Sequence, residues 1–155
     1  MAGEVDARLA KLGIEVPQAA APVANYVGFV QVGNLVFISG QVPLKDGKFQ
    51  FQGKLGESMS LEDGQAAARL CAINVIAQAK AACGGDLDRV KRVVKLTGFV
   101  NSTGDFTDQP KVVNGASDLM VEVFGDKGKH SRAAVSAASL PVGVAVEVEA
   151  VIEIS

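Results

Sequence analysis

The spacing of apolar residues changes along the chain, and each spacing predicts a different kind of element. Near the start, Val5, Leu9 and Leu12 recur with the period of one helix face. The Pro- and Ala-rich stretch that follows has no period, which is typical of an extended surface segment. We therefore expect an N-terminal extension over residues 1–22 and a single domain over residues 23–155.

Dense β-branched and aromatic residues predict strands early in the domain and at its centre. Residues 25–43 read as two strands joined by a tight turn at Gly33 and Asn34. A Gly-rich loop follows, and one short strand is expected in it around residues 49–51. Residues 93–100 are so rich in apolar side chains that the strand they predict should be covered on most of both faces.

Two long stretches with helical spacing each carry a start and a stop signal. Ser60 with Asp63 resembles a capping box, and Gly84 would end the first helix. Asp108 would cap the second helix, which Gly125 would end. The expected apolar stripes are Ala67, Leu70, Cys71, Asn74, Ala77 and Ala81 in the first helix, and Val112, Val113, Ala116, Leu119, Met120 and Val123 in the second.

The end of the chain predicts two more strands, around residues 132–137 and 144–154. In the last strand, apolar residues alternate with Glu147, Glu149 and Glu153, so the two sets point to opposite faces. Two helices cannot cover both faces of the sheet that these strands would form. If both lie over the apolar set, the glutamate face is either in water or part of a polar subunit interface or cleft.

Composition narrows the class of protein. Among 155 residues, 48% are hydrophobic but only 5% are aromatic, so the core must be built mainly from Val, Ala, Leu and Ile. A net charge of -2 gives no basic field for nucleic acid, which is not expected as a partner. The N-terminus lacks the apolar core of a signal peptide and no long apolar run occurs, so we expect a cytoplasmic protein without membrane contact.

Few residues suggest chemistry by themselves. Cys71 and Cys83 have no CxxC spacing and only one histidine exists, so we expect buried thiols and no metal site. His130 lies among lysines and is expected to be an exposed loop residue, which disfavours a histidine-based triad. Arg132 stands where this loop becomes a strand. It could form a structural ion pair or a ligand site, and the sequence pattern leaves both open.

Three segments together resemble a known family. The strings NYVGFVQVGNLVFISGQVP (25–43), VVKLTGFVNSTGDF and SRAAVSAASLPVGVAVEVEAV are similar to those of the reactive intermediate deaminases, RidA or YjgF, also labelled L-PSP endoribonucleases. The resemblance implies an α+β, chorismate-mutase-like mixed sheet with two helices packed on one face. It also implies a homotrimer with a central β-barrel and clefts between subunits that bind small carboxylate-bearing metabolites. The implied activity is cofactor-independent hydrolysis of enamines and imines, such as 2-aminoacrylate, to 2-oxo acids and ammonia.

The resemblance also assigns candidate site residues. The planar guanidinium at the arginine position would hold a substrate carboxylate through two parallel N–H bonds, and the glutamate would orient or deprotonate the attacking water. This chain has Ala134 where many members have a cysteine, so thiol chemistry at that position is excluded. Carried over residue by residue, the catalytic positions are Arg132 and Glu147, and the substrate-binding positions are Arg132, Tyr26, Ser39, Gly40 and Asn114.

Apart from the resemblance, Tyr26 could be a half-buried core residue and Ser39 a hydroxyl bonded to the backbone.

Two other functions stay open from the sequence. A trimer that binds small 2-oxo acids without turning them over, and regulates a partner, would use the same cleft as a hydrolase. Ribonuclease activity is disfavoured by the acidic balance and by the single histidine.

Overall fold

The computed structural model of the protein describes residues 3–22 and 24–155. The predicted boundary between extension and domain adjoins residue 23, which lies outside the described residues. The helices are α1 (Glu4–Lys11), α2 (Leu61–Ala82) and α3 (Gln109–Phe124), with 3₁₀ turns at Leu87–Arg89, Gly125–Gly128 and Pro141–Gly143. The strands are β1 (Phe29–Val32), β2 (Leu35–Gln41), β3 (Leu44–Lys45), β4 (Lys48–Phe49), β5 (Val90–Asn101), β6 (Ser131–Ala137) and β7 (Val146–Ile154).

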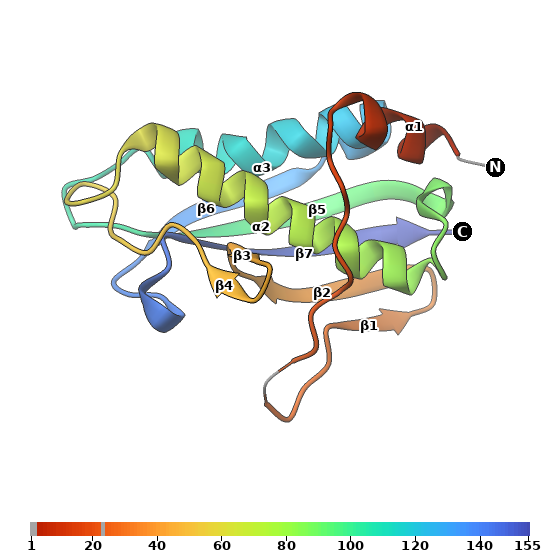
Figure 1. The fold of residues 1–155 in the computed structure, drawn as a ribbon, viewed down its shortest axis with the longest axis horizontal. Coiled ribbons are helices and arrows are strands. Elements are labelled where there is room, and N and C mark those ends of the chain that lie inside the picture. Colours follow the sequence, from red (N-terminus) through yellow and green to blue (C-terminus); the bar gives the residue numbers. More distant parts are fainter. Residues whose placement is uncertain (1–2, 23) are drawn as a thin grey trace.

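Five strands form one mixed sheet in the order β1-β2-β7-β5-β6, and β3 and β4 form a separate hairpin (Figure 1). Strands β5 and β6 are parallel, and the other pairs in the large sheet are antiparallel. Helices α2 and α3 lie over the same face (Figure 1). The apolar residues of β7 are buried beneath them, as the alternation predicts. The predicted α+β class with two long helices on one face is confirmed.

The helix start signals are largely confirmed. The Ser60 hydroxyl accepts a hydrogen bond from the N–H of Asp63 at 3.1 Å, which satisfies one of the free donors at the start of α2. Asp108 occupies the N-cap position of α3 without a side-chain cap bond, and Pro110 lies in the first turn. All six residues of the predicted α3 stripe are buried.

Three sequence expectations need correction. The buried face of α2 is wider than the expected stripe because the helix contacts both the sheet and α3, while Ala81 is exposed and Leu70 and Asn74 are only partly buried. Strand β5 is covered on one face only, and Val94 on its other face is 36% exposed. The polar loop forms the β3–β4 hairpin, and Phe51 lies outside it.

The N-terminal extension packs onto the domain. Val5 and Leu9 of α1 belong to the hydrophobic core, and the Asp88 carboxylate accepts the N–H groups of Glu4 and Val5, both at 3.0 Å. The extended residues 14–22, which we call the strap, then run across α2 toward β1 (Figure 1). Both parts of the extension therefore have defined positions.

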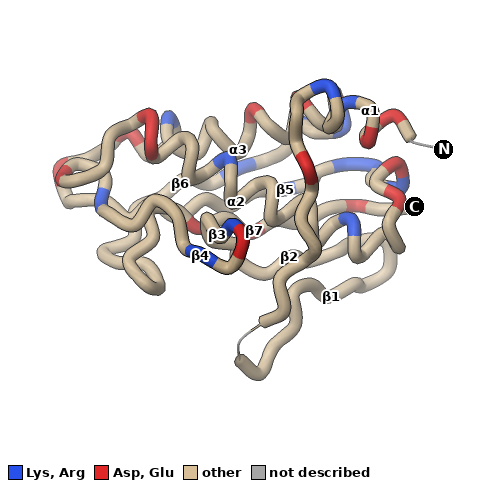
Figure 2. The backbone as a smooth tube through the Cα atoms, viewed as in Figure 1, with Lys and Arg blue, Asp and Glu red and all other residues tan. Residues whose placement is uncertain are grey.

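The sheet face opposite the helices carries exposed apolar side chains. Register places them on the same face as the glutamates of β7, because Phe37 pairs with Val151 and Val135 pairs with Phe99, which in turn pairs with Glu147. Lysine and arginine positions are interspersed with acidic positions along the backbone (Figure 2). No helix among the described residues is long and apolar enough to span a membrane. The exposed apolar residues of this open face include Val30, Val32, Leu35, Phe37 and Val135.

Candidate functional site

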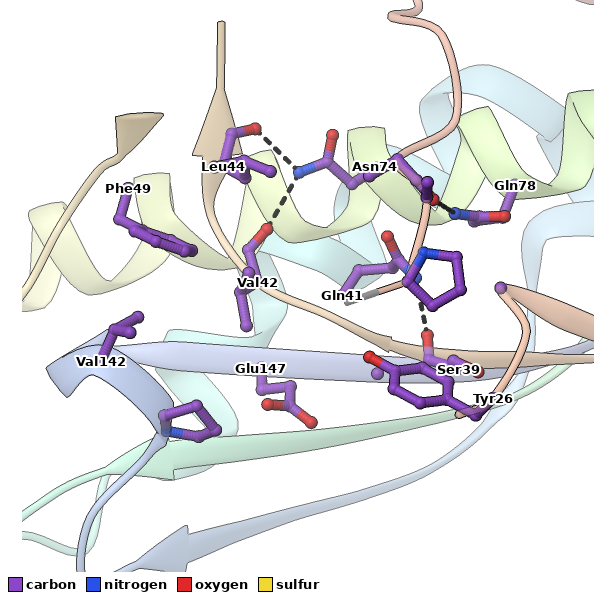
Figure 3. A pocket seen from close by; sticks show the side chains of 16 residues that line it. Tyr26, Ser39, Gln41, Val42, Leu44, Phe49, Asn74, Gln78, Val142 and Glu147 are labelled. Atoms are coloured by element: carbon purple, nitrogen blue, oxygen red, sulfur yellow. Dashed lines mark hydrogen bonds between the residues drawn. The ribbon is translucent and has the colours of Figure 1, made fainter. Parts of the chain in front are cut away.

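A pocket of about 470 Å³ lies between the strap, the β1–β2 region, α2 and the start of β7. Four predicted site residues line it: Tyr26, Ser39, Gly40 and Glu147. Figure 3 shows the Glu147 carboxylate between the Tyr26 and Ser39 side of the pocket and the Val142 side. We call this space the Glu147 pocket. Among the described residues that line it, Glu147 carries the one formal charge, and no lysine or arginine is present.

The electrostatic setting of Glu147 suits a proton acceptor. Burial raises the pKa of its carboxyl above the usual value, and the nearby negative charge of Glu149 raises it further. A carboxylate with a raised pKa is a stronger base than one in water, and such shifts are concentrated at functional sites.

A local irregularity in β2 makes room for this carboxylate. The pairing of β2 with β7 shifts register between Ile38 and Gln41, so Ser39 and Gly40 form a bulge beside Glu147. A Cβ atom at Gly40 would clash with Glu147 Oε2 and would lie 2.9 Å from its Cδ. The glutamate can occupy its position because residue 40 has no side chain.

Ser39 and Tyr26 border the pocket in different ways. The Ser39 hydroxyl donates a hydrogen bond to the Val27 carbonyl at 2.7 Å, and the Ser39 N–H donates to the Gly28 carbonyl at 2.9 Å. Ser39 therefore fixes the loop that carries Tyr26, and its oxygen can still accept a hydrogen bond from a ligand. Tyr26 is 53% exposed, so it is a pocket-edge residue and not the half-buried core tyrosine of the alternative reading.

Arg132 and Asn114 lie together, away from the Glu147 pocket. Arg132 Nη1 donates to Asn114 Oδ1 at 2.8 Å and to Ser117 Oγ at 3.2 Å. No ion pair within the described part of the chain joins Arg132 to a carboxylate, so the structural ion pair that the sequence left open does not form there. Arg132 is half-buried, and the groups that accept its side-chain hydrogen bonds, Asn114 Oδ1 and Ser117 Oγ, are neutral.

His130 completes this cluster, contrary to the sequence expectation of an exposed loop residue. The ring is half-buried, with Nδ1 at 2.6 Å from the Gly128 carbonyl and Nε2 at 2.9 Å from Ser117 Oγ. Because a carbonyl can only accept, Nδ1 carries the proton, and in the neutral ring Nε2 accepts from the serine hydroxyl. The lysines next to His130 suggested an exposed loop. Nothing in the sequence pointed to this contact, because Ser117 lies 13 residues earlier.

Sheet register separates Arg132 from Glu147 within one chain. Arg132 pairs with Leu96, which is buried under the helices, so its side chain is on the helix-covered face. Glu147 pairs with Phe99 on the open face, and two strand spacings, about 10 Å, separate β6 from β7. The two predicted catalytic residues of one chain therefore cannot both contact one small ligand.

The cysteines have no direct part in either site. Both are buried and free, as predicted. Burial raises the pKa of the Cys71 thiol, and the negative charge of Glu147 raises it further. The same thiol donates a hydrogen bond to the Val146 carbonyl at 3.4 Å. Among residues 3–22 and 24–155, no cluster of three His, Cys, Asp or Glu side chains is arranged to hold a metal.

The fold and the site together define a family. A sequence model of a protein family, described as YjgF/chorismate mutase-like with a proposed endoribonuclease activity, matches residues 6–154 of this chain. The chain therefore belongs to the YjgF/chorismate mutase-like family, and the resemblance inferred from the sequence is confirmed.

Particular relatives cover most of the chain. TCP17 of Trypanosoma cruzi is 53% identical over 154 residues, which is 99% of this chain and 96% of TCP17. The crystal structure of Atu1372 from Agrobacterium tumefaciens, of unknown function, has a TM-score of 0.92 at 46% identity and covers 97% of this chain and 92% of its own. The structure of Escherichia coli TdcF, solved with bound serine, has a TM-score of 0.62 at 26% identity. The match covers 89% of this chain and 94% of the TdcF chain.

Proposed function

We propose that this protein hydrolyses small 2-imino acids to 2-oxo acids and ammonia at sites shared between two copies of the chain. The observation that carries the proposal is the separation of charges. The Glu147 pocket holds a carboxylate of raised pKa and no cation among its described lining residues, while the Arg132 guanidinium lies on the other face and forms no ion pair with a carboxylate of the described residues. A substrate with its own carboxylate needs both.

Assembly can supply the missing cation. The open face of the sheet exposes Val32 by 62%, Phe37 by 45% and Val135 by 45%, on either side of the β7 glutamates, and exposed apolar side chains of this kind favour contact with another chain. We propose a homotrimer whose sheets enclose a central barrel. Arg132 lies on β6 at the edge of the sheet, so this edge can bring it to the Glu147 pocket of the next subunit. Cyclic symmetry would repeat this site at each interface.

The chemistry requires a water molecule and no electron transfer. Arg132 would bind the substrate carboxylate through two N–H groups and fix the position of the imine carbon. Glu147 would take a proton from water as the water oxygen bonds to the imine carbon, and would pass that proton to the nitrogen, which gives a carbinolamine. When the amino group takes up a further proton from solvent, the C–N bond breaks, ammonia leaves and the hydroxyl proton passes to Glu147 or water, which leaves the 2-oxo acid. Tyr26 and Ser39 can hydrogen-bond the water or the nitrogen.

Imine trapping tests the proposal. An amino acid oxidase generates the imine, and semicarbazide traps whatever is not hydrolysed first. We expect the wild-type protein to suppress trapping, and Arg132→Lys to lose about 100-fold of this activity because one ammonium cannot replace the two-pronged guanidinium. Arg92→Lys is the matched control. Arg92, like Arg132, lies on the sheet, but its side chain donates to the Lys129 backbone carbonyl. An active Arg132→Lys trimer would refute the arginine role.

Ligand binding without turnover is the second candidate. Bound serine in TdcF favours it, because a small amino acid occupies that relative without showing that the relative is an enzyme. If no imine is hydrolysed but 2-oxo acids bind, this candidate replaces the first. Ribonuclease activity fits less well, since a pocket whose formal charge is that of Glu147 repels a phosphate backbone.

A further inference from the structure

The strap forms one wall of the Glu147 pocket. Ala20, Ala21 and Pro22 line the pocket, together with other apolar residues such as Val42 and Phe49. None of the strap residues brings a polar side chain to this wall, so it can contact an apolar group of a ligand and cannot hydrogen-bond one through side chains. The volume of about 470 Å³ exceeds what 2-aminoacrylate needs.

A buried glutamine holds the wall in place. Gln78 on α2 is 3% exposed, and its Nε2 donates to the Ala20 carbonyl at 3.1 Å (Figure 3). Its other end lies against Gly28, where a Cβ atom would clash with Oε1 and approach Cδ to 2.9 Å. Gln78 therefore connects the strap to the β1–β2 region that also carries Tyr26.

The far end of the extension is anchored separately. Asp88 accepts the first N–H groups of α1, and Arg8 Nη1 donates to the Val123 carbonyl at 3.3 Å. With α1 held at one end and Ala20 at the other, the strap cannot swing freely over the pocket. The wall is thus a fixed surface and can discriminate between ligands by shape.

We infer that the strap is a specificity element: residues 20–22 bind the apolar side chain of a branched or aromatic 2-imino or 2-oxo acid, and Gln78 is the positioning residue that sets this wall. The inference rests on the proposed function for its substrate class. It also gives a role to the packing of residues 20–22 against the Glu147 pocket, whose polar side chains all come from other segments of the chain.

Size preference is the readout, measured both as binding and as turnover. Calorimetry gives the dissociation constants of pyruvate and of 4-methyl-2-oxopentanoate, and imine trapping gives kcat/KM for the imines of alanine and leucine. In Gln78→Leu, which removes the amide at similar volume, we expect the preference for the larger ligand to fall about tenfold, while values for the smaller one stay nearly constant. Gln65→Leu is the matched control, because Gln65 on the same helix donates to the Lys111 carbonyl at 3.0 Å.

A second variant approaches the wall from the other side. Ala21 is exposed at the pocket, so Ala21→Phe should fold normally, fill part of the space and weaken binding of the larger ligand first. An unchanged size preference in both variants, with ligands still bound, would overturn the strap inference and leave the proposed function standing. Altered binding preference without turnover of any imine would support the strap and refute the hydrolase. If neither 2-oxo acid binds the wild-type protein and no imine is hydrolysed, both proposals fail.

Discussion

At the scale of single residues, the family resemblance identified some of the residues that line the Glu147 pocket, but not how they interact. The four residues that the resemblance assigned to this part of the site line one pocket, because a bulge in β2 places Ser39 and Gly40 beside Glu147, close to Tyr26. Gln78 was missed. A glutamine within an apolar helix gives no signal in the sequence, and its partner carbonyl lies 58 residues away.

The raised pKa of Glu147 links activity to stability. A carboxyl whose pKa is higher in the folded state than in the unfolded state binds its proton more tightly when folded, so stability falls as pH rises through the interval between the two values. In an Arg132→Ala background, which removes the cation proposed to reach Glu147 from another subunit, we expect Glu147→Gln to raise the melting temperature at neutral pH and to have no such effect in acid, below the usual glutamate range. With Arg132 intact, imine hydrolysis by Glu147→Gln should be about 100-fold slower than by the wild type. A lower melting temperature at neutral pH would contradict the account of the burial cost.

The pH profile should respond to the neighbouring carboxylate. Because Glu149 helps to raise the pKa of Glu147, Glu149→Gln should lower that pKa. If ionised Glu147 is the base, the acidic limb of kcat/KM should move to lower pH while the plateau is retained. The measurement is kcat/KM across pH for both proteins. An acidic limb that stays in place would mean that it reports another group.

Gly40 tests the position of the carboxylate. Its backbone φ lies outside the left-handed region, so alanine is acceptable to the backbone but its Cβ must displace Glu147. We expect Gly40→Ala to lower kcat/KM about tenfold with little change in melting temperature. Gly104→Ala is the control, because nothing lies within 4 Å of a Cβ there. Full activity in Gly40→Ala would show that the exact position of Glu147 is unimportant.

At the scale of elements, periodicity and caps predicted nearly every helix and strand. The signals were local: the Ser60 cap, the turn at Gly33, and alternation in β7. The errors arose where tertiary contacts decide burial. The second face of β5 is open in one chain, and α2 buries a broader face because α3 packs beside it. Neither contact can be read from the spacing within one element.

The contact between α2 and α3 depends on Gly115. A Cβ atom there would clash with the backbone oxygen of Gln65 and would lie 2.8 Å from its carbonyl carbon. Helix propensity alone favours Gly115→Ala by about 1 kcal/mol. We expect the overpacking to dominate and to reduce the free energy of unfolding by about 2 kcal/mol, because a helix backbone cannot give way as a side chain can. Urea denaturation measures this, and a more stable variant would contradict the close packing.

At the scale of the whole molecule, the two residues of the proposed site, Arg132 and Glu147, lie on opposite faces of the sheet in one chain. The sequence placed Arg132 and Glu147 in one list, and only the register of β5 with its neighbours shows that they project from different faces. The exposed apolar residues of the open face give the physical reason to expect assembly. The central claim is therefore that a working site needs two subunits.

Complementation between two inactive variants tests this claim most directly. Arg132→Ala and Glu147→Gln are unfolded, mixed in equal amounts and refolded, and imine hydrolysis is compared with each variant refolded alone. In randomly mixed trimers, about one quarter of the interfaces pair an intact Arg132 with an intact Glu147. We expect about a quarter of wild-type activity from the mixture and almost none from either variant alone. An inactive mixture that contains mixed trimers would show that the two residues do not act together across an interface.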